Sequence, residues 1–319
     1  MKLSIITVSW NVCDDLIQCL RSIKQYPPAF LYEIIVVDNH SSDDTAKRIL
    51  GEFPDVRLIV NPENFGFAAA NNIGIQEAKG EYLLILNPDT LVLPHSIDLL
   101  IRFMDSHSDV GICGPQILNS DRTIQSSARM YPTFQAIFYR FTIFKYLGLF
   151  RRHFYLWTMR DFDHNSMRNV EQLTGAALMT RFSLVKKLGG FDTHYFIYYE
   201  EVDLCKRVSM AGYRVVFYPA PQIIHLGGCS AKQIPAKVKL IMLTSLIFYL
   251  RKYYSGWTNR LLIFLFKVGV FTRQIVELLI YGIATLFSLT DSLRREKYYS
   301  RFTSCFEFLT KYYIGLLFK

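Results

Sequence analysis

Near its start the chain alternates between short apolar runs and a segment of helical spacing, and this alternation limits the fold more than any other feature. Residues 2–9 and 32–37 are rich in β-branched and aliphatic side chains, as buried strands are. Between them, residues 14–25 place apolar side chains at helical intervals. A strand, a helix and a second strand in this order predict a parallel βαβ unit, and so an α/β sheet flanked by helices.

The same alternation continues through most of the chain. Further strands are predicted at 56–60, 82–86, 110–113, 170–180 and 212–218, and helices at 44–53, 94–106 and 182–188. Residues 114–169 are basic and aromatic, and we interpret them as an insertion over the functional site. With 319 residues, 51% of them hydrophobic, the chain can bury one large core and carry an appendage.

A carboxylate follows the most apolar of these strands. The run Tyr82–Leu86 is cut short by Pro88, which cannot continue a ladder of hydrogen bonds, and Asp89 comes next. Ligands bind at the carboxyl ends of strands in open α/β sheets, and a carboxylate there can hold a divalent ion against phosphates. The alternative is that Asp89 only caps the next helix, which we predict to begin near Pro94.

Polar residues also follow the second and third strands. Asp38 closes the second strand, where an acidic side chain commonly accepts a hydrogen bond from a nucleoside. Asp38 and Ser41 could instead turn the chain and cap the following helix, and both roles can hold together. In the loop after the third strand, Gly66 lets a ligand approach the backbone, and Asn72 offers a neutral donor and acceptor.

Two more candidate groups lie towards the carboxyl end. Glu200, Glu201 and Asp203 follow a crowd of aromatic residues and start a predicted helix, whose dipole favours them. Burial among aromatic rings would raise a carboxyl pKa towards values useful for a general base, although a plain acidic first turn is the alternative. His225 precedes two glycines and a serine, which favours a phosphate or metal site over a core position. Residues 161–164 (Asp-Phe-Asp-His) resemble a metal motif, but no strand brings them to a sheet edge, so we reject them.

The last part of the chain is both basic and apolar. Residues 236–319 hold 13 Lys and Arg against 4 Asp and Glu, which accounts for the whole net charge of +9. On a helical wheel, one side carries the charges and the other the aliphatic residues, as in a helix that lies in a membrane interface. The charged side is Arg260, Lys267, Arg273 and Glu277, and the apolar side is Leu261, Leu262, Leu265, Val268 and Ile275.

This pattern predicts an anchor on an anionic membrane surface. A helical subdomain or a dimer face is the alternative, and nucleic-acid binding is not expected because aliphatic bulk separates the basic residues. The six cysteines show no metal-binding spacing, and Met1-Lys2 leads straight into a strand. We therefore expect a cytoplasmic protein, peripheral on the inner face of the cell membrane.

Taken together, seven motifs resemble those of family 2 glycosyltransferases, most of all the bacterial rhamnosyltransferase-like branch. They are Ser4–Asn11, Val36–Asp43, Asn64–Asn72, Leu86–Thr90, Gly189–Asp192, Tyr199–Asp203 and His225–Ser230. The resemblance spans about residues 3–230 and implies a GT-A fold. It implies a glycosyltransferase domain at 1–235, with a nucleotide-sugar half at about 1–115 and an acceptor half at about 116–235. The rest, 236–319, is the basic amphipathic helical tail.

The resemblance also assigns roles to residues of this chain. Asp38 would contact the base, Asp89 would hold Mg²⁺ or Mn²⁺ on the diphosphate, and His225 would be a further metal or diphosphate ligand. Glu201 occupies the position of the catalytic base, with Glu200 beside it. The other predicted nucleotide-sugar residues are Thr7, Ser9, Asn64, Gly66, Asn72, Asn87 and Gly175.

Two positions depart from the family pattern. Asn87 stands where many members carry an aspartate, and Glu201 stands where aspartate is usual, so Glu200 or Asp203 could be the base instead. An imidazole ligand favours manganese over magnesium.

The predicted function is inverting transfer of a sugar, with rhamnose favoured, from a dTDP- or UDP-sugar. The acceptor would be a hydroxyl of a lipid-linked or cell-surface polysaccharide, in particular a polyprenyl-linked glycan. One alternative is a membrane-bound nucleotide-sugar-binding or scaffolding protein without turnover. Another is a nucleotidyltransferase or phosphohydrolase, which would call for more clustered acids or a basic loop after the first strand.

Overall fold

The computed structural model describes residues 1–227, 234–288 and 291–318. The chain forms two compact units. The α/β unit contains Met1–Tyr131 and Asp161–Ser230, and the helical unit contains Pro132–Arg160 and Ala231–Lys319. Residues 132–160, which the sequence placed in the acceptor half, thus pack with the tail. The division of function into a nucleotide-sugar half and an acceptor half stays a prediction.

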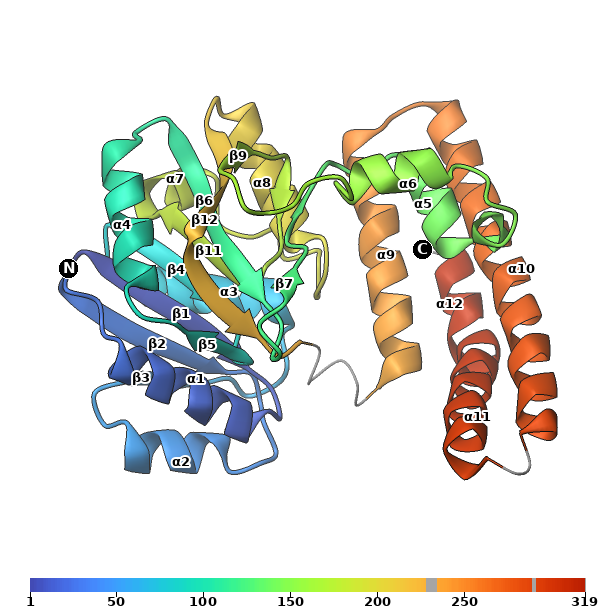
Figure 1. The fold of residues 1–319 in the computed structure, drawn as a ribbon, viewed down its shortest axis with the longest axis horizontal. Helices are drawn as coiled ribbons and strands as arrows, with labels where there is room; N and C mark the ends of the chain where they lie inside the picture. Colours follow the sequence, from blue (N-terminus) through green and yellow to red (C-terminus); the bar gives the residue numbers. More distant parts are fainter. Residues whose placement is uncertain (228–233, 289–290, 319) are drawn as a thin grey trace. The chain divides into compact units, whose positions relative to one another are not determined.

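Ten strands of the described residues form one sheet, whose main path runs β3-β2-β1-β4-β11-β6-β12-β5, and two more strands form a small second sheet (Figure 1). The strands are β1 (Leu3–Ser9), β2 (Tyr32–Asp38), β3 (Arg57–Val60), β4 (Tyr82–Leu86), β5 (Thr90–Val92), β6 (Val110–Leu118), β7 (Ile124–Gln125), β8 (Ala128–Arg129), β9 (Arg168–Asn169), β10 (Gln172–Leu173), β11 (Ala177–Arg181) and β12 (Arg214–His225). Strands β1 to β4 are parallel, and β12 runs parallel to β6, whereas β11 is antiparallel to both of its neighbours. The mixed, mostly parallel sheet confirms the predicted fold class.

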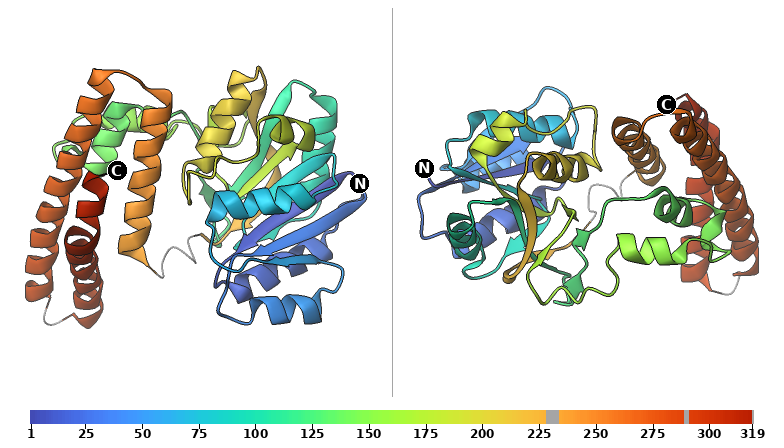
Figure 2. Two further views of the ribbon diagram at one scale, coloured as in Figure 1. Left: turned by 180° about the vertical axis from the view of Figure 1, so that it is seen from behind. Right: turned by 90° about the horizontal axis from the view of Figure 1, so that it is seen from above.

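Helices cover both faces of this sheet (Figure 2). Helices α1 (Cys13–Gln25), α2 (Thr45–Glu52) and α4 (Ser96–Ser106) share one apolar core with the strands. Helices α3 (Phe67–Glu77), α7 (Phe182–Lys187) and α8 (Glu200–Met210) lie on the other face. The central strands are buried on both sides, which explains why they are continuous apolar runs instead of alternating ones.

Several strands differ from the prediction, among them β5, β6 and the strand predicted at 170–180. Strand β5 follows Asp89 directly, and α4 begins only at Ser96 with His95 as its N-cap, so Asp89 does not cap that helix. Strand β6 continues through Pro115 because its pairing with β12 shifts register at that point, and the missing N–H breaks no ladder bond there. The strand predicted at 170–180 is two strands, β10 and β11, separated by a turn at Gly175.

The helical unit combines two segments of the chain. Its elements are α5 (Phe134–Phe141), η1 (Ile143–Lys145), α6 (Arg151–Trp157), α9 (Pro235–Tyr253), α10 (Trp257–Phe287), α11 (Ser292–Glu307), η3 (Phe308–Tyr312) and α12 (Tyr313–Leu317). The ring of Phe266 on α10 lies 6.1 Å from those of Phe138 and Phe141 on α5. In the part of the chain that the structure describes, no helix has both the length and the hydropathy needed to span a membrane.

Candidate active site

The carboxyl ends of β1 and β2 bring Ser9 and Asp38 together. These two residues are paired in the parallel register, so their side chains lie on the same face of the sheet. Asp38 is buried, and one of its carboxylate oxygens accepts a hydrogen bond from the backbone N–H of Ser41 at 3.2 Å. The hydroxyl oxygens of Ser9 and Thr7 are also buried and have no hydrogen-bond partner among the described residues. Unpaired buried hydroxyls at this edge favour a ligand-binding role.

Asn11 fastens the loop after β1 to the loop after β2. Its side-chain oxygen accepts a hydrogen bond from the backbone N–H of Ser42 at 2.7 Å, and its own N–H donates to the hydroxyl of Ser41 at 3.0 Å. Asn11 and His40 both adopt left-handed backbone conformations, with φ of 53° and 68°. Such conformations in non-glycine residues are concentrated at functional sites. From the sequence, Asn11 was identified only as the last residue of the motif Ser4–Asn11.

Asn39 is a second organising residue that the sequence analysis missed. Its amide nitrogen donates to the side-chain oxygen of Asn64 at 2.8 Å, and its oxygen accepts from the backbone N–H of Phe65 at 3.1 Å. Gly66 has φ of 84°, and a Cβ there would lie 2.5 Å from the carbonyl oxygen of Phe196. The glycine is therefore required for close approach of two protein segments as well as for its backbone conformation.

Asn72, predicted to contact the nucleotide sugar, is engaged within the protein. Its nitrogen donates to the carbonyl oxygen of Phe191, and its oxygen accepts from the N–H of Phe191, both at 2.8 Å. A Cβ on Gly190 would collide with the same amide at 2.4 Å. These contacts favour a role in holding the glycine turn against α3, and contact with a ligand stays a prediction for Asn72.

Asn87 and Asp89 lie at the end of β4. The backbone N–H of Asn87 donates to the carbonyl oxygen of Ala176 at 2.9 Å, while its side-chain oxygen is buried without a hydrogen-bond partner among the described residues. The carbonyl oxygen of Asp89 accepts from the N–H of Leu226 at 2.9 Å, because β5 and β12 pair at this point. Strand β12 thus delivers its last residue, His225, to the aspartate.

The side chains of Asp89 and His225 face one another. The Nε2 atom of His225 lies 3.3 Å from a carboxylate oxygen of Asp89, and both side chains are largely buried. The other ring nitrogen, Nδ1, donates to the side-chain oxygen of Gln125 on β7 at 2.8 Å. In the neutral ring, Nε2 then turns its lone pair towards the carboxylate. That arrangement is repulsive unless a cation lies between the two groups or the ring is protonated.

This pair fits a divalent cation. Two ligands bound at about 2.1 Å and at right angles lie about 3 Å apart, close to the separation observed. Among the described residues, no cluster of three or more His, Cys, Asp or Glu side chains is arranged to hold a metal. Protein ligands at this edge are therefore few, and further ligands would come from a bound phosphate and water, as is usual for hard cations at nucleotide sites. Residues 228–230 of the predicted motif lie outside the described residues.

Glu200 and Glu201 form the first turn of α8. The two tyrosines before them have φ of 70° and 71°, a strained conformation for aromatic residues, which fixes the start of the helix. Each glutamate has one buried carboxylate oxygen without a hydrogen-bond partner among the described residues. Burial and the neighbouring Glu201 carboxylate raise the pKa of Glu200 well above its usual range. Burial also raises the pKa of Glu201, although backbone hydrogen bonds and the charge of Arg129 oppose this shift.

Gly175 lies in a turn that contacts both Glu201 and the end of β4, where Asn87 and Asp89 lie. A Cβ on Gly175 would lie 3.7 Å from the Cβ of Glu201, so the bare backbone of this turn packs against the glutamate side chain. The next residue, Ala176, accepts the hydrogen bond from Asn87. The turn between β10 and β11 therefore places the end of β4 and the first turn of α8 on two sides of one short segment. Larger side chains at Gly175 would fill the space beside Glu201.

Asp203 has a structural partner. Arg207 donates to its carboxylate at 2.6 Å and also to the carbonyl oxygens of Leu188 and Gly190. The Asp203 side chain is fully buried. This engagement favours Glu200 or Glu201 over Asp203 as the base.

The histidine of the motif at 161–164 lies in the apolar core. His164 is buried, with its ring 4.5 Å from that of Phe162 and 5.3 Å from that of Phe217. Its Nδ1 contacts the carbonyl oxygen of Phe162, and the N–H of Ala128 donates to its Nε2. Burial lowers its pKa, so the neutral ring is a core residue with both nitrogens in use.

A mixed, mostly parallel sheet covered by helices on both faces is the architecture of the GT-A glycosyltransferase fold. The model of the family described as Glycosyl transferase family 2 matches residues 4–187. The chain belongs to glycosyltransferase family 2.

Two bacterial relatives are rhamnosyltransferases. The N-acetylglucosaminyl-diphospho-decaprenol L-rhamnosyltransferase of Mycobacterium tuberculosis is 30% identical over 237 residues, which cover 70% of this chain and 76% of the relative. Rhamnosyltransferase WbbL of Escherichia coli is 27% identical over 202 residues, which cover 61% of this chain and 72% of the relative. The match to rhamnosyltransferases confirms the resemblance found in the sequence.

Solved structures agree on the fold. One is a mannosyltransferase from Pyrobaculum calidifontis, solved in complex with GDP-Man and Mn²⁺. It superposes on this chain with a TM-score of 0.53 at 15% identity, and the matched region covers 98% of this chain and 88% of the mannosyltransferase chain. Another is GalNAc-T7, solved with UDP, GalNAc and Mn²⁺, with a TM-score of 0.56 at 19% identity. The matched region covers 70% of this chain and 43% of the GalNAc-T7 chain. At such identities the likeness concerns the fold alone.

Proposed function

We propose that the chain is an inverting, metal-dependent glycosyltransferase that uses a nucleotide diphosphate sugar. The observation that carries this proposal is the facing pair of Asp89 and His225 at the end of β4, 3.3 Å apart, with Gly175 joining that edge to Glu201. The pair suits a cation on a diphosphate, and Glu201 suits proton transfer. No covalent intermediate with the protein is required, so the anomeric configuration inverts.

Asp89 and His225 would hold Mn²⁺ or Mg²⁺. The bound ion would neutralise charge on the leaving diphosphate. The imidazole ligand favours manganese, and Gln125 would fix its ring by accepting from Nδ1. Asn87 is uncharged where many family members have an aspartate, so the site carries less negative charge. We therefore expect weak metal binding when no nucleotide-sugar donor is bound.

Glu201 would take the proton from the acceptor hydroxyl as that oxygen attacks the anomeric carbon. Burial raises its pKa, which makes the carboxylate a stronger base than an exposed glutamate. Glu200 is more deeply buried, and burial together with the neighbouring Glu201 carboxylate raises its pKa, which favours its neutral form. A neutral Glu200 beside an ionised Glu201 avoids two adjacent charges, and we therefore assign the base to Glu201.

Asp38, with Ser9 and Thr7 beside it, would bind the nucleoside. Asn64 and Gly66 would shape the same pocket through the loop that Asn39 organises.

Rhamnose and a polyprenyl-linked acceptor are favoured by the names of the relatives. Two of them are rhamnosyltransferases, and the mycobacterial enzyme acts, by its name, on a decaprenol diphosphate carrying N-acetylglucosamine. An acceptor of this kind is confined to a membrane surface. We accordingly place the protein at the cytoplasmic face of the cell membrane, as a peripheral protein.

Labelled sugar transfer tests the proposal. Nucleotide donors, dTDP-rhamnose included, are incubated with lipid extract, Mn²⁺ and either wild type or Glu201→Gln. Glu296→Gln, an exposed glutamate on α11, is the control. Label that enters lipid from one donor, survives in the control and disappears in Glu201→Gln supports the proposed reaction.

A second candidate is a nucleotide-sugar-binding protein without turnover, which the uncharged Asn87 favours. It predicts donor binding in the same experiment but no release of nucleoside diphosphate with any acceptor. Equal labelling by wild type and Glu201→Gln would instead move the base to Glu200.

A further inference from the structure

Helix α10 is polar inside and apolar outside. From Leu261 to Phe287, every exposed residue is apolar, while Lys267 and Glu277 are buried and Arg273 is half-buried. The exposed residues are Leu261, Phe264, Leu265, Val268, Phe271, Ile275, Val276, Leu279, Ile280, Ile283, Leu286 and Phe287. Of the side predicted to be charged, Lys267, Arg273 and Glu277 face other helices and not water, whereas Arg260 is exposed. A surface helix of a soluble protein normally shows the opposite arrangement.

A charged network fills the inner side of this helix. Arg273 donates to the carboxylate of Glu277 at 2.8 Å, and the hydroxyl of Tyr146 donates to the same carboxylate at 3.0 Å. Lys239 on α9 donates to Gln274 at 2.6 Å, and Gln274 donates to Glu277 at 3.2 Å. Lys267 donates to the carbonyl oxygen of Leu317 at 2.8 Å. Polar bonds join α10 to its neighbours here, as they do between helices surrounded by lipid.

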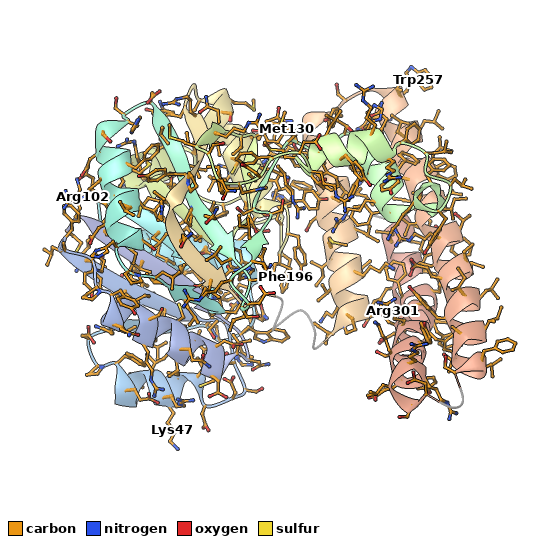
Figure 3. All side chains as sticks on the ribbon, viewed as in Figure 1. Lys47, Arg102, Met130, Phe196, Trp257 and Arg301 are labelled. Carbon is orange, nitrogen blue, oxygen red and sulfur yellow. The ribbon has the colours of Figure 1, made fainter. Side chains whose placement is uncertain are left out.

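The ends of the apolar face carry aromatic and basic groups. Trp257, 74% exposed, stands at the start of α10 (Figure 3), and Arg260 follows one turn later. Beyond the other end, α11 begins with exposed basic side chains and with Tyr298 and Tyr299. Exposed Lys and Arg residues from α9 onward are Lys237, Arg251, Lys252, Arg260, Arg294, Arg295, Lys297, Arg301 and Lys311, whereas the exposed acidic residue in the described part of this region is Glu296. Tryptophan, tyrosine and basic side chains suit the head-group level of an anionic bilayer.

We propose that the outer face of α10 inserts among the acyl chains of one leaflet of an anionic phospholipid bilayer. The helix would lie along the membrane surface, with its apolar side chains buried about 5–10 Å into the boundary between head groups and acyl chains. The exposed basic residues would contact the phosphates, and the Arg273–Glu277 network would stay inside the unit. This inference rests on the proposed membrane location and adds the surface and the kind of contact. A second copy of the chain is the other occupant that an apolar face could take.

Vesicle flotation tests this surface with the full chain. Vesicles of phosphatidylcholine, with or without phosphatidylglycerol, are floated with wild type, with the double variant Leu279→Glu and Ile283→Glu, and with Leu50→Glu. The control places the same change on a leucine that is 67% exposed on α2 of the α/β unit. We expect wild type and the control to float with anionic vesicles, and the partition coefficient of the double variant to fall at least about tenfold.

A second measurement keeps the test valid if the double variant fails to fold. Phe264→Trp retains an apolar aromatic group at a position that is 59% exposed. Lipids brominated on their acyl chains should quench the added tryptophan fluorescence, after subtraction of the wild-type signal. Absence of this quenching would overturn the proposal.

Two further outcomes would also overturn it. One is equal flotation of the double variant and wild type. The other is a dimer that the double variant converts to monomer while vesicle binding is unchanged, which would assign the face to a second copy. Release of nucleoside diphosphate with a soluble acceptor, measured without vesicles, reports separately on the proposed reaction. If sugar transfer persists but vesicle binding fails, the proposed function is retained and only the proposed lipid-binding surface is refuted.

Discussion

Replacing Gln125 by leucine tests the Asp89–His225 pair without altering either of those side chains. Gln125 accepts the 2.8 Å hydrogen bond from Nδ1 of His225 and thereby fixes the ring with Nε2 towards Asp89. Leucine has a similar size but no acceptor, so the ring would lose its orientation and the Nδ1–H its partner.

The size of the effect follows from this one bond. Loss of the partner of a metal-bound histidine typically weakens metal affinity about 10–100-fold. That range equals about 1.4–2.8 kcal/mol. Leaving the Nδ1–H partly buried and unpaired costs about 1–3 kcal/mol, which is the same magnitude. We therefore expect the half-saturating Mn²⁺ concentration to rise by one to two orders of magnitude.

Electron paramagnetic resonance of free Mn²⁺, in the presence of UDP or dTDP, measures this affinity without turnover. Gln125→Glu is the matched variant because it keeps an acceptor at the same place and adds negative charge, so its affinity should equal or exceed that of wild type. His225→Ala sets the value expected when the ligand is lost altogether. Unchanged Mn²⁺ affinity in Gln125→Leu, with weakened affinity in His225→Ala, would refute the idea that Gln125 positions the ring.

Three other substitutions have defined outcomes. Asp89→Ala should abolish transfer and leave the circular dichroism spectrum unchanged. Normal turnover by this variant would show that Asp89 is not a metal ligand. Arg207→Met should lower the free energy of unfolding in urea by about 3–5 kcal/mol, because Asp203 would remain buried without its ion pair. Burial raises the pKa of Glu201, so transfer should be lost on the acid side as pH falls through this raised pKa, at higher pH than for an exposed glutamate. Arg129→Leu should move that loss to still higher pH in profiles of kcat/KM, because the charge of Arg129 opposes the shift.

Matched variants separate these effects from general damage. Arg214 pairs with Asp109 at 2.6 Å, but the two side chains are 38% and 59% exposed, so Arg214→Met should cost less than about 1 kcal/mol. Similar losses of stability in the Arg207 and Arg214 variants would contradict the importance of burial. Arg129→Lys keeps the positive charge and should retain a profile near that of wild type, whereas identical profiles for lysine and leucine would exclude an electrostatic role.

Strands and helices with strong local patterns were predictable from the sequence. The runs that became β1, β2 and β4 are continuous and apolar because both faces of the sheet are covered, and this signal needs no knowledge of partners. Strand β5 has only three residues, and its pairing with β12 decides its conformation. A proline such as Pro115 is unfavourable inside a strand because it lacks an N–H. The register shift in the β6–β12 pairing falls at Pro115, so no hydrogen bond from this residue is needed. Such features depend on residues more than 100 positions away.

Candidate site residues were easier to find than the residues that hold them. Asp89 and Glu201 end or begin elements and carry charge, so their chemistry is visible locally. Gln125 and Asn39 act through hydrogen bonds to residues distant in sequence, and nothing beside them marks that role. The helical wheel separated Lys267, Arg273 and Glu277 from the apolar side of α10, but a helical wheel does not say which face is covered. That depends on α9 and on two elements distant in sequence, α5 and η1.

The helical unit is built from two segments that leave the ribosome at different times. The hydrogen bond between Tyr146 and Glu277 joins residues 131 positions apart. At about 5–20 residues per second, roughly ten seconds separate the synthesis of these two residues. During that interval the aromatic faces of α5 and α6 have no partner from α9 or α10. A truncation within the tail therefore removes one half of this unit and leaves the other half exposed. Shortened chains thus combine the loss of the tail with the exposure of the aromatic faces of α5 and α6.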